Sequence, residues 1–209
     1  MGPRDELVEA AYAALRTRIA AGRFAPRARL SADSLAQSLH VGVTPTRIAL
    51  HWLHRDGLVD HWPGDGFFAK TPSLEDVRSL LVASRILLDG AARMPEPRAS
   101  DIGVARTSLN AKGVAASDAL FLEIASRTGS ELVMRTVDII NARLRPAREA
   151  ELDIFDDLDR EREAIAERLA VGHGRALATA LARYHRRRLS RIADIAERTL
   201  IRSMMGAER

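Results

Sequence analysis

The sequence contains no cysteine among its 209 residues. This absence excludes disulfide bridges, thiolate catalysis and the cysteine-based zinc and iron–sulfur sites. A long apolar run is also missing, because no stretch approaches the ~18 residues that a membrane-spanning helix needs. The N-terminal residues lack the apolar core of a signal peptide. We therefore expect a soluble, cytoplasmic protein that has no membrane partner.

Lysine is almost absent as well, and the basic residues are nearly all arginine, with Lys70 and Lys112 as the exceptions. The formal net charge is +4, and the pI is about 10.2. This balance weakly favours a polyanionic partner, although the positive excess is not confined to one half of the chain. The length and the 46% hydrophobic content allow one or two domains with a substantial core.

Residues 30–70 form the stretch around which the rest of the chain is organised. Two short helices are predicted here, and the first opens at Ser31, whose hydroxyl can cap it. The second is predicted to start with a capping hydroxyl on Thr44 and with Pro45 at the first helical position, where its missing N–H is harmless. Gly57 can end this helix in the left-handed conformation.

A hairpin is predicted directly after the second helix. Its turn is Pro63-Gly64-Asp65-Gly66, flanked by the apolar pairs Leu58-Val59 and Phe67-Phe68. Two helices joined by a tight turn and followed by such a ribbon make a winged helix-turn-helix, whose second helix fits the major groove of DNA.

The amino-acid sequence of this stretch resembles that of the GntR family of bacterial transcription regulators. The resemblance rests on residues 41–47 (VGVTPTR), 57–59 (GLV) and 64–66 (GDG), and on the apolar spacing of the helix before them. It implies a DNA-binding domain over residues 1–72.

The chain after residue 72 is predicted to be almost entirely helical. The expected fold class is therefore mainly α, with the winged helix-turn-helix followed by an all-helical bundle of about six helices. Prolines 95 and 97 are expected to break the first of these helices, and Pro146 to interrupt the fourth. The six predicted helices span residues 74–94, 101–111, 114–128, 132–148, 152–171 and 175–203.

This second part is similar to the helical effector domain of the FadR branch of the GntR family, known as the FCD domain. The similarity is carried by residues 84–92 (SRILLDGAA), 118–121 (DALF) and 125–130 (ASRTGS), together with the helix spacing. It implies that residues 73–209 bind an effector and hold two copies of the chain together as a homodimer.

Six residues are predicted to contact DNA. The N-terminus of the second helix offers N–H groups to phosphate, and Arg47 can reach a phosphate or a guanine. The alternative is an ordinary helix cap with one surface arginine. The family usually has basic residues where Val43 and Asp65 stand here, so either the operator differs or the affinity depends on dimerisation. The predicted contacts are Thr44, Pro45, Thr46, Arg47, Gly64 and Gly66.

Three histidines, His51, His54 and His61, lie close together in this stretch. A metal site would need further ligands and supporting hydrogen bonds, so a solvated helix face is the preferred interpretation. When protonated, the three side chains would add positive charge on the DNA side.

The resemblance places four metal ligands of the family at Asp118, Leu122, Arg162 and His185. Because Leu122 and Arg162 cannot bind a metal, we expect no metal and no other cofactor, and we expect Arg162 to hold Asp118 in the metal's place. Guanidinium groups pair well with carboxylates, so an acidic effector is predicted. Its predicted contacts are Arg85, Asp118, Arg143, Arg162 and His185. In the run 185–188, three of the four side chains are expected to point outward.

The leading hypothesis is therefore a homodimeric regulator that binds double-stranded operator DNA and responds to a small, acidic effector. One alternative keeps the fold without sensing: a constitutive DNA-binding protein or a protein-interaction module with a filled bundle core. An enzyme is the least favoured class, because the sequence offers no catalytic residues in the form of a nucleophile paired with a base. A cavity lined by arginine would favour the first hypothesis, and packed side chains would favour the second.

Overall fold

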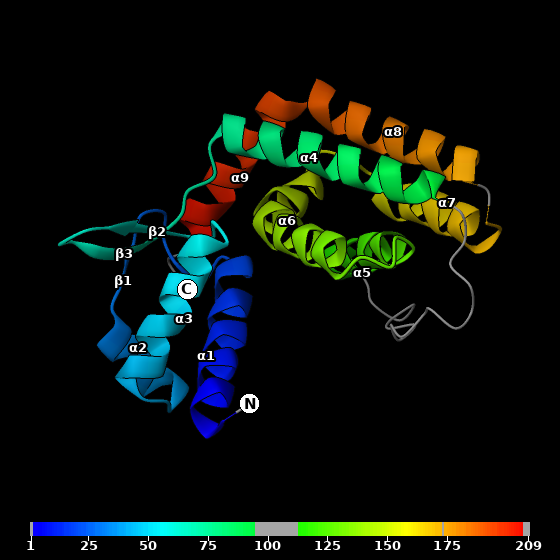
Figure 1. Ribbon diagram of the computed structural model, residues 1–209. Coiled ribbons are helices and arrows are strands. Elements are labelled where there is room, and N and C mark those ends of the chain that lie inside the picture. Colours follow the sequence, from blue (N-terminus) through cyan, green and yellow to red (C-terminus); the bar gives the residue numbers. More distant parts are fainter. Residues whose placement is uncertain (1, 95–112, 173, 207–209) are drawn as a thin grey trace. The chain divides into compact units, whose positions relative to one another are not determined.

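The computed structural model describes residues 2–94, 113–172 and 174–206, and Figure 1 shows the course of the chain. The described part contains nine helices and one small sheet. The chain divides into two compact units, each described below by itself. The first unit runs up to Pro72 and also takes the chain from Thr199 onward, and the second unit is Ser73–Arg198.

Three helices form the body of the first unit: α1 (Pro3–Ala20), α2 (Ala32–Leu39) and α3 (Val43–Arg55). Both α1 and α2 pack against α3. Their aliphatic side chains recur at helical spacing, so each helix buries one stripe in a shared core. The largest fully buried members are Leu15, Leu50 and Leu53.

The start of α2 agrees with the prediction, and the start of α3 differs from it. The hydroxyl of Ser31 accepts a hydrogen bond from the N–H of Ser34 at 3.4 Å, and α2 ends at His40 in the left-handed conformation with φ 55°. The predicted cap at Thr44 is wrong, because α3 begins at Val43 behind an extended Gly42, so its cap and its first residue both lie two positions earlier than predicted. Pro45 is thus the third helical residue, where its N–H would still have no partner in the helix.

The C-terminus of α3 follows the prediction. Gly57 is left-handed with φ 74°, its N–H donates to the carbonyl of His54 at 2.9 Å, and the N–H of Leu58 donates to that of Leu53 at 2.9 Å. These paired bonds satisfy the last carbonyls of the helix and turn the chain sharply into the sheet.

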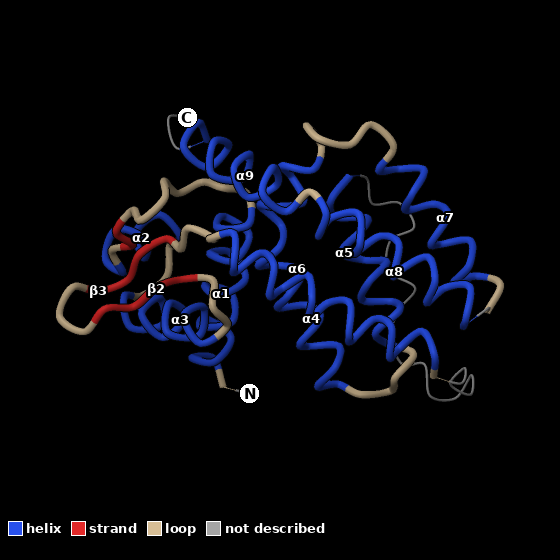
Figure 2. The backbone as a smooth tube through the Cα atoms, turned by 90° about the horizontal axis from the view of Figure 1, so that it is seen from above, coloured by secondary structure: helices blue, strands red, loops and turns tan. Residues whose placement is uncertain are grey.

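The sheet consists of β1 (Arg29–Leu30), β2 (Val59–Trp62) and β3 (Gly66–Ala69) in the antiparallel order β1-β3-β2. Figure 2 shows β2 and β3 as the hairpin that forms the wing. Val59 lies opposite Ala69 and Trp62 lies opposite Gly66, so the hairpin closes over residues 63–65.

Six further helices follow: α4 (Leu74–Arg93), α5 (Gly113–Ser126), α6 (Glu131–Glu151), α7 (Leu158–Ala170), α8 (Gly174–Ser190) and α9 (Ile192–Gly206). The division between the units falls inside α9. The predicted helix 101–111 and the break at prolines 95 and 97 lie outside the described residues. Among the described helices, none is both long and apolar enough to cross a membrane. The predicted fold class is confirmed.

After residue 72, three further features of the helices were predicted wrongly. Pro146 lies inside α6 without interrupting it, because the buried residues on both sides of it, Leu144 and Ala147, keep the helix packed. The helix expected from residue 152 starts only at Leu158, after a turn. The single long final helix is two helices, α8 and α9, which meet at Arg191.

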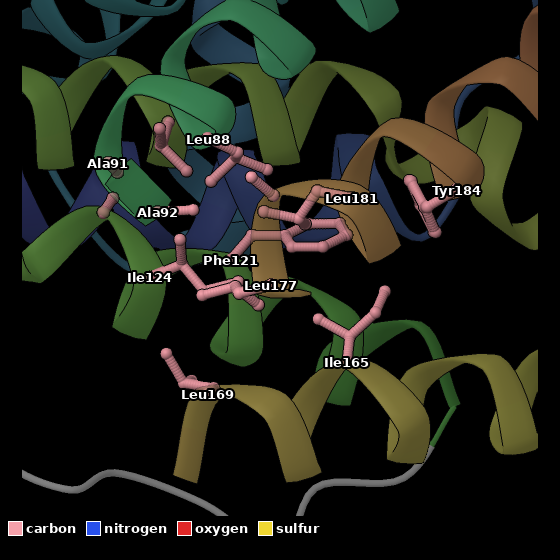
Figure 3. Packing of buried hydrophobic residues seen from close by; sticks show 13 residues of the cluster. Leu88, Ala91, Ala92, Phe121, Ile124, Ile165, Leu169, Leu177, Leu181 and Tyr184 are labelled. Atoms are coloured by element: carbon pink, nitrogen blue, oxygen red, sulfur yellow. The ribbon is translucent and has the colours of Figure 1, made fainter. Parts of the chain in front are cut away.

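Two hydrophobic clusters lie in the described part of the second unit. One surrounds Phe121, whose ring lies among aliphatic side chains from α4, α7 and α8 (Figure 3). The other joins α4, α6 and the first part of α9 through Val77, Leu144 and Ile195. Buried polar side chains line the same helices, and they form the second candidate site described below.

Candidate nucleic-acid interface and the polar core of the helical unit

The start of α3 separates the predicted DNA contacts into two groups. Thr44 and Arg47 are exposed, whereas Pro45 and Thr46 are buried. The hydroxyl of Thr46 donates to the carbonyl of Gly42 at 2.9 Å, so this side chain holds the helix start together. The exposed stripe continues one turn later at His51, which lies four residues after Arg47.

The wing presents a short, exposed turn. Gly64 and Gly66 have φ of 89° and 101°, values that favour glycine, so they shape the wing through the backbone. The tip carries Asp65, and Trp62 beside it has 57% of its surface exposed. The wing thus offers backbone groups and one indole to a partner, together with an acidic residue where the family usually has a basic one.

The three histidines connect α3 to the wing. The ring of His61 lies 5.1 Å from that of His51 and 5.6 Å from that of His54, and both His51 and His61 pack on Phe67. Burial lowers the pKa of His51, and the nearby His61, His54 and Arg47 lower it further. Within the described residues, no three histidine or carboxylate side chains gather as a metal site.

In the helical unit, Asp118 has different partners from the one predicted. Its carboxylate accepts from the buried guanidinium of Arg148 and lies 3.4 Å from that of Arg145. Asn141 completes the group, because its amide oxygen accepts from Arg148 at 3.0 Å and its amide N–H donates to the carbonyl of Asp118 at 3.1 Å. Burial raises the pKa of Asp118, and the two arginines oppose that shift.

The predicted pair of Arg162 with Asp118 is therefore wrong. Arg162 lies on α7 and pairs with Asp159 on the same helix, with 2.8 Å between its guanidinium and the carboxylate. It also donates to the carbonyl of Gly113 at 3.4 Å. The partners of Asp118 come instead from α6, whose residues 141, 145 and 148 share one face toward α5.

Arg188 forms a second buried ion cluster. Its guanidinium donates to Glu151 at 3.0 Å and to Glu161 at 2.7 Å, and it lies 3.4 Å from the centre of the Tyr184 ring. Burial alone would lower its pKa, but Tyr184, Glu151 and Glu161 raise it. The expectation that three of residues 185–188 point outward is wrong, because His185 and Arg188 are both buried.

His185 is fully buried between α8 and α4. Its Nδ1 lies 2.8 Å from the carbonyl oxygen of Leu181, which can only accept, so Nδ1 carries the proton. Its Nε2 lies 3.1 Å from the hydroxyl of Ser84 and accepts from it. Burial lowers the pKa of His185 to about 4, so the ring is neutral near pH 7.

The residues at the four metal-ligand positions that the resemblance implies do not fit a metal ion. The ring nitrogens of His185 and the carboxylate of Asp118 are already engaged, and the charge of Arg148 at Asp118 would repel a cation. Leu122 packs against the apolar core. We therefore derive no metal chemistry from this site.

The predicted effector contacts are not brought together. Arg85 is exposed on α4, and the guanidinium of Arg143 is half-buried 3.9 Å from the carboxylate of Asp76. The cavity beside Arg162, Arg148 and Arg188 holds only about 30 Å³, which is room for a water molecule. Ion pairs fill the centre of the bundle where an effector was expected.

Sequence reasoning missed the members of this polar core, namely Asn141, Arg148, Glu151, Tyr184 and Arg188. A signal for three of them existed, because Asn141, Arg148 and Glu151 recur at helical spacing among the buried apolar residues of α6. Polar residues on an apolar stripe indicate a buried network.

The geometry defines a winged helix-turn-helix protein with an attached helical bundle. Residues 7–69 match the family model "Bacterial regulatory proteins, gntR family". This part of the chain is therefore a gntR-family helix-turn-helix domain.

Solved structures share the fold over nearly the whole chain. A candidate GntR transcriptional regulator from Rhodococcus sp. RHA1 is 21% identical, with a TM-score of 0.65, covering 89% of this chain and 97% of that one. McbR/YncC of E. coli is 15% identical, with a TM-score of 0.65, covering 90% and 97%. No curated protein matches the chain.

Proposed function

We propose that this protein is a homodimeric transcription regulator that binds operator DNA through α3 and the wing. The single observation that carries the proposal is the exposed stripe of Thr44 and Arg47 at the start of α3, in a domain that matches the gntR family. An exposed helix N-terminus offers N–H groups to phosphate, and an arginine one turn further can form two hydrogen bonds with a guanine.

The second unit is proposed to be the effector and dimerisation domain of a FadR-branch regulator, with its division from the DNA-binding domain after Pro72. Its arrangement of helices supports this assignment. The centre of the bundle is filled by side chains, which favours the alternative of a protein without an effector site at the bundle centre. An acidic effector would therefore have to bind elsewhere in this unit. Asp118 is paired with Arg148, and the Nε2 of His185 is hydrogen-bonded to Ser84, so neither side chain is available to bind a metal. This supports a regulator that works without a metal.

The test is Arg47→Ala, titrated against the DNA upstream of the encoding gene by fluorescence anisotropy. We expect the variant to bind about 1–3 kcal/mol more weakly if Arg47 reads a base, and with a smaller salt dependence if it contacts phosphate. Arg186→Ala is the matched control, because it removes an exposed arginine from α8 in the other unit. Unchanged affinity and salt dependence in Arg47→Ala would reject docking through α3.

A further inference from the structure

A larger groove lies away from the filled centre of the bundle. It runs between α7 and α8 and has a volume of about 640 Å³, a size typical of small-molecule sites. Its lining combines small apolar residues with arginine. The apolar floor is formed by Ala164, Ile165, Ala176 and Ala180.

Three arginines line this groove: Arg168 in the last turn of α7, and Arg175 and Arg183 on α8. Throughout the described residues, none of the three forms an ion pair with a carboxylate. Arg168 donates to the carbonyl of Ala164 in its own helix. The groove therefore holds three positive charges for which the described part of the chain provides no counter-ion.

The one carboxylate in the lining does not cancel this charge. Glu161 accepts from Arg188 at 2.7 Å, and its other oxygen lies 3.6 Å from Arg187. Both of its oxygens are thus engaged by arginines outside the groove. Because Arg168 and Arg175 lie next to the connection between the two helices, positive charge is concentrated at that end.

We propose that the α7–α8 groove binds a small organic carboxylate with an apolar body. The carboxylate lies at the end with Arg168 and Arg175, where guanidinium groups bind it through paired hydrogen bonds. The apolar body lies along Ala176 and Ala180, where it removes apolar surface from water. Only the link between this site and control of DNA binding rests on the proposed function.

Octanoate is a suitable probe, because it joins a carboxylate to an aliphatic chain, and octan-1-ol is its uncharged counterpart. We expect calorimetry on the full chain to show octanoate binding and much weaker octan-1-ol binding. Arg175→Gln combined with Arg183→Gln should weaken octanoate binding at least about tenfold, the loss expected for charge-assisted hydrogen bonds. Arg186→Gln, on the same helix but outside the groove, should leave it unchanged.

Thr179→Trp tests the apolar part of the site without a change in charge. Thr179 is exposed within the groove, so an indole there should occupy the space of the aliphatic chain and weaken octanoate binding. Circular dichroism would show that each variant remains folded.

Several results would overturn the proposal: equal binding of octanoate and octan-1-ol, no binding of octanoate, or unchanged binding in both groove variants. Dissociation of a dimer in the Arg175 and Arg183 variant would also overturn it, because the groove would then be an interface between copies. Arg47→Ala should bind octanoate normally. Octanoate binding tests the proposal for the groove, and DNA binding by Arg47→Ala tests the proposal for α3, so either proposal can be rejected without the other.

Discussion

Two arginines in the helical unit, Arg148 and Arg188, are buried, and each is held by carboxylates on neighbouring helices. A buried charge is tolerated only with good partners, and removing one partner of such a pair is strongly destabilising, by roughly 3–5 kcal/mol. Each arginine also lies on an aromatic ring, Phe121 or Tyr184, which adds a favourable contact to the guanidinium. These residues hold the positions of α5, α6, α7 and α8 by charge as well as by apolar packing.

His185 predicts a specific dependence of stability on pH. Its pKa is about 4 in the folded protein and near 6.5 in the unfolded chain, so the unfolded state binds more protons between these values. The free energy of unfolding should therefore fall as pH decreases from 6.5 to 4, by about 3 kcal/mol from this residue. Urea unfolding of the wild type and of His185→Gln across this range measures the effect.

The variant should show a shallower loss of stability toward acid, since other titrating groups are common to both proteins. Its stability at pH 7 is expected to be lower, because Ser84 loses its acceptor on the imidazole. Parallel curves for the two proteins between pH 6.5 and 4 would contradict the assignment of a neutral, buried imidazole.

At the scale of single elements, the start of α8 depends on a close approach to the end of α4. A Cβ added at Gly174 would lie 2.8 Å from the carbonyl oxygen of Ala92, closer than such atoms approach. We expect Gly174→Ala to lower the free energy of unfolding by about 1–3 kcal/mol, because the backbones must move apart. Urea unfolding followed by circular dichroism is the measurement.

Gly90→Ala is the matched control on α4. It lies inside the helix, and a Cβ there would meet nothing within 4 Å. The same substitution should therefore raise the free energy of unfolding by roughly 0.5–1 kcal/mol, because alanine loses less entropy in a helix. Opposite signs at the two glycines are the expected outcome; stabilisation at both would contradict the close packing of α8 on α4.

At the scale of the whole molecule, we expect a two-fold homodimer. One recognition helix of 13 residues makes too few base contacts for operator-level affinity, and two-fold regulators double them on a pseudo-palindromic site. Light scattering should give twice the 23.0 kDa mass of the chain. Arg47→Ala should keep that mass, because Arg47 is exposed in the DNA-binding unit.

The arrangement on DNA provides a stricter test of the dimer. Inserting about 5 base pairs between the half-sites turns one of them to the opposite face of the helix, whereas about 10 base pairs restore the face. The shorter insertion should therefore weaken binding more. A mass of one chain at working concentration, together with equal effects of the two insertions, would exclude the dimer.

The local structure of the DNA-binding unit could be predicted from the sequence by itself. Ser31 and Gly57 act through their own backbone or through neighbours within a few residues, and such signals can be read along the chain. The start of α3 was misplaced by two residues, because both Gly42 and Thr44 can cap a helix there. The exposure of the residues in the first turn of α3 could not be predicted in this way, because it depends on packing. Packing buries Thr46 and leaves Arg47 exposed.

Only the tertiary structure decided the polar core. The partner of Asp118 is Arg148 and not Arg162, because the choice depends on which faces of α5, α6 and α7 meet, and helical spacing alone leaves that open. Burial of Arg188 likewise depends on Glu151 and Glu161, which are distant in sequence and approach it only when α6 and α7 pack against α8. Local signals specify elements, whereas the pairing of charges between elements is set by the fold.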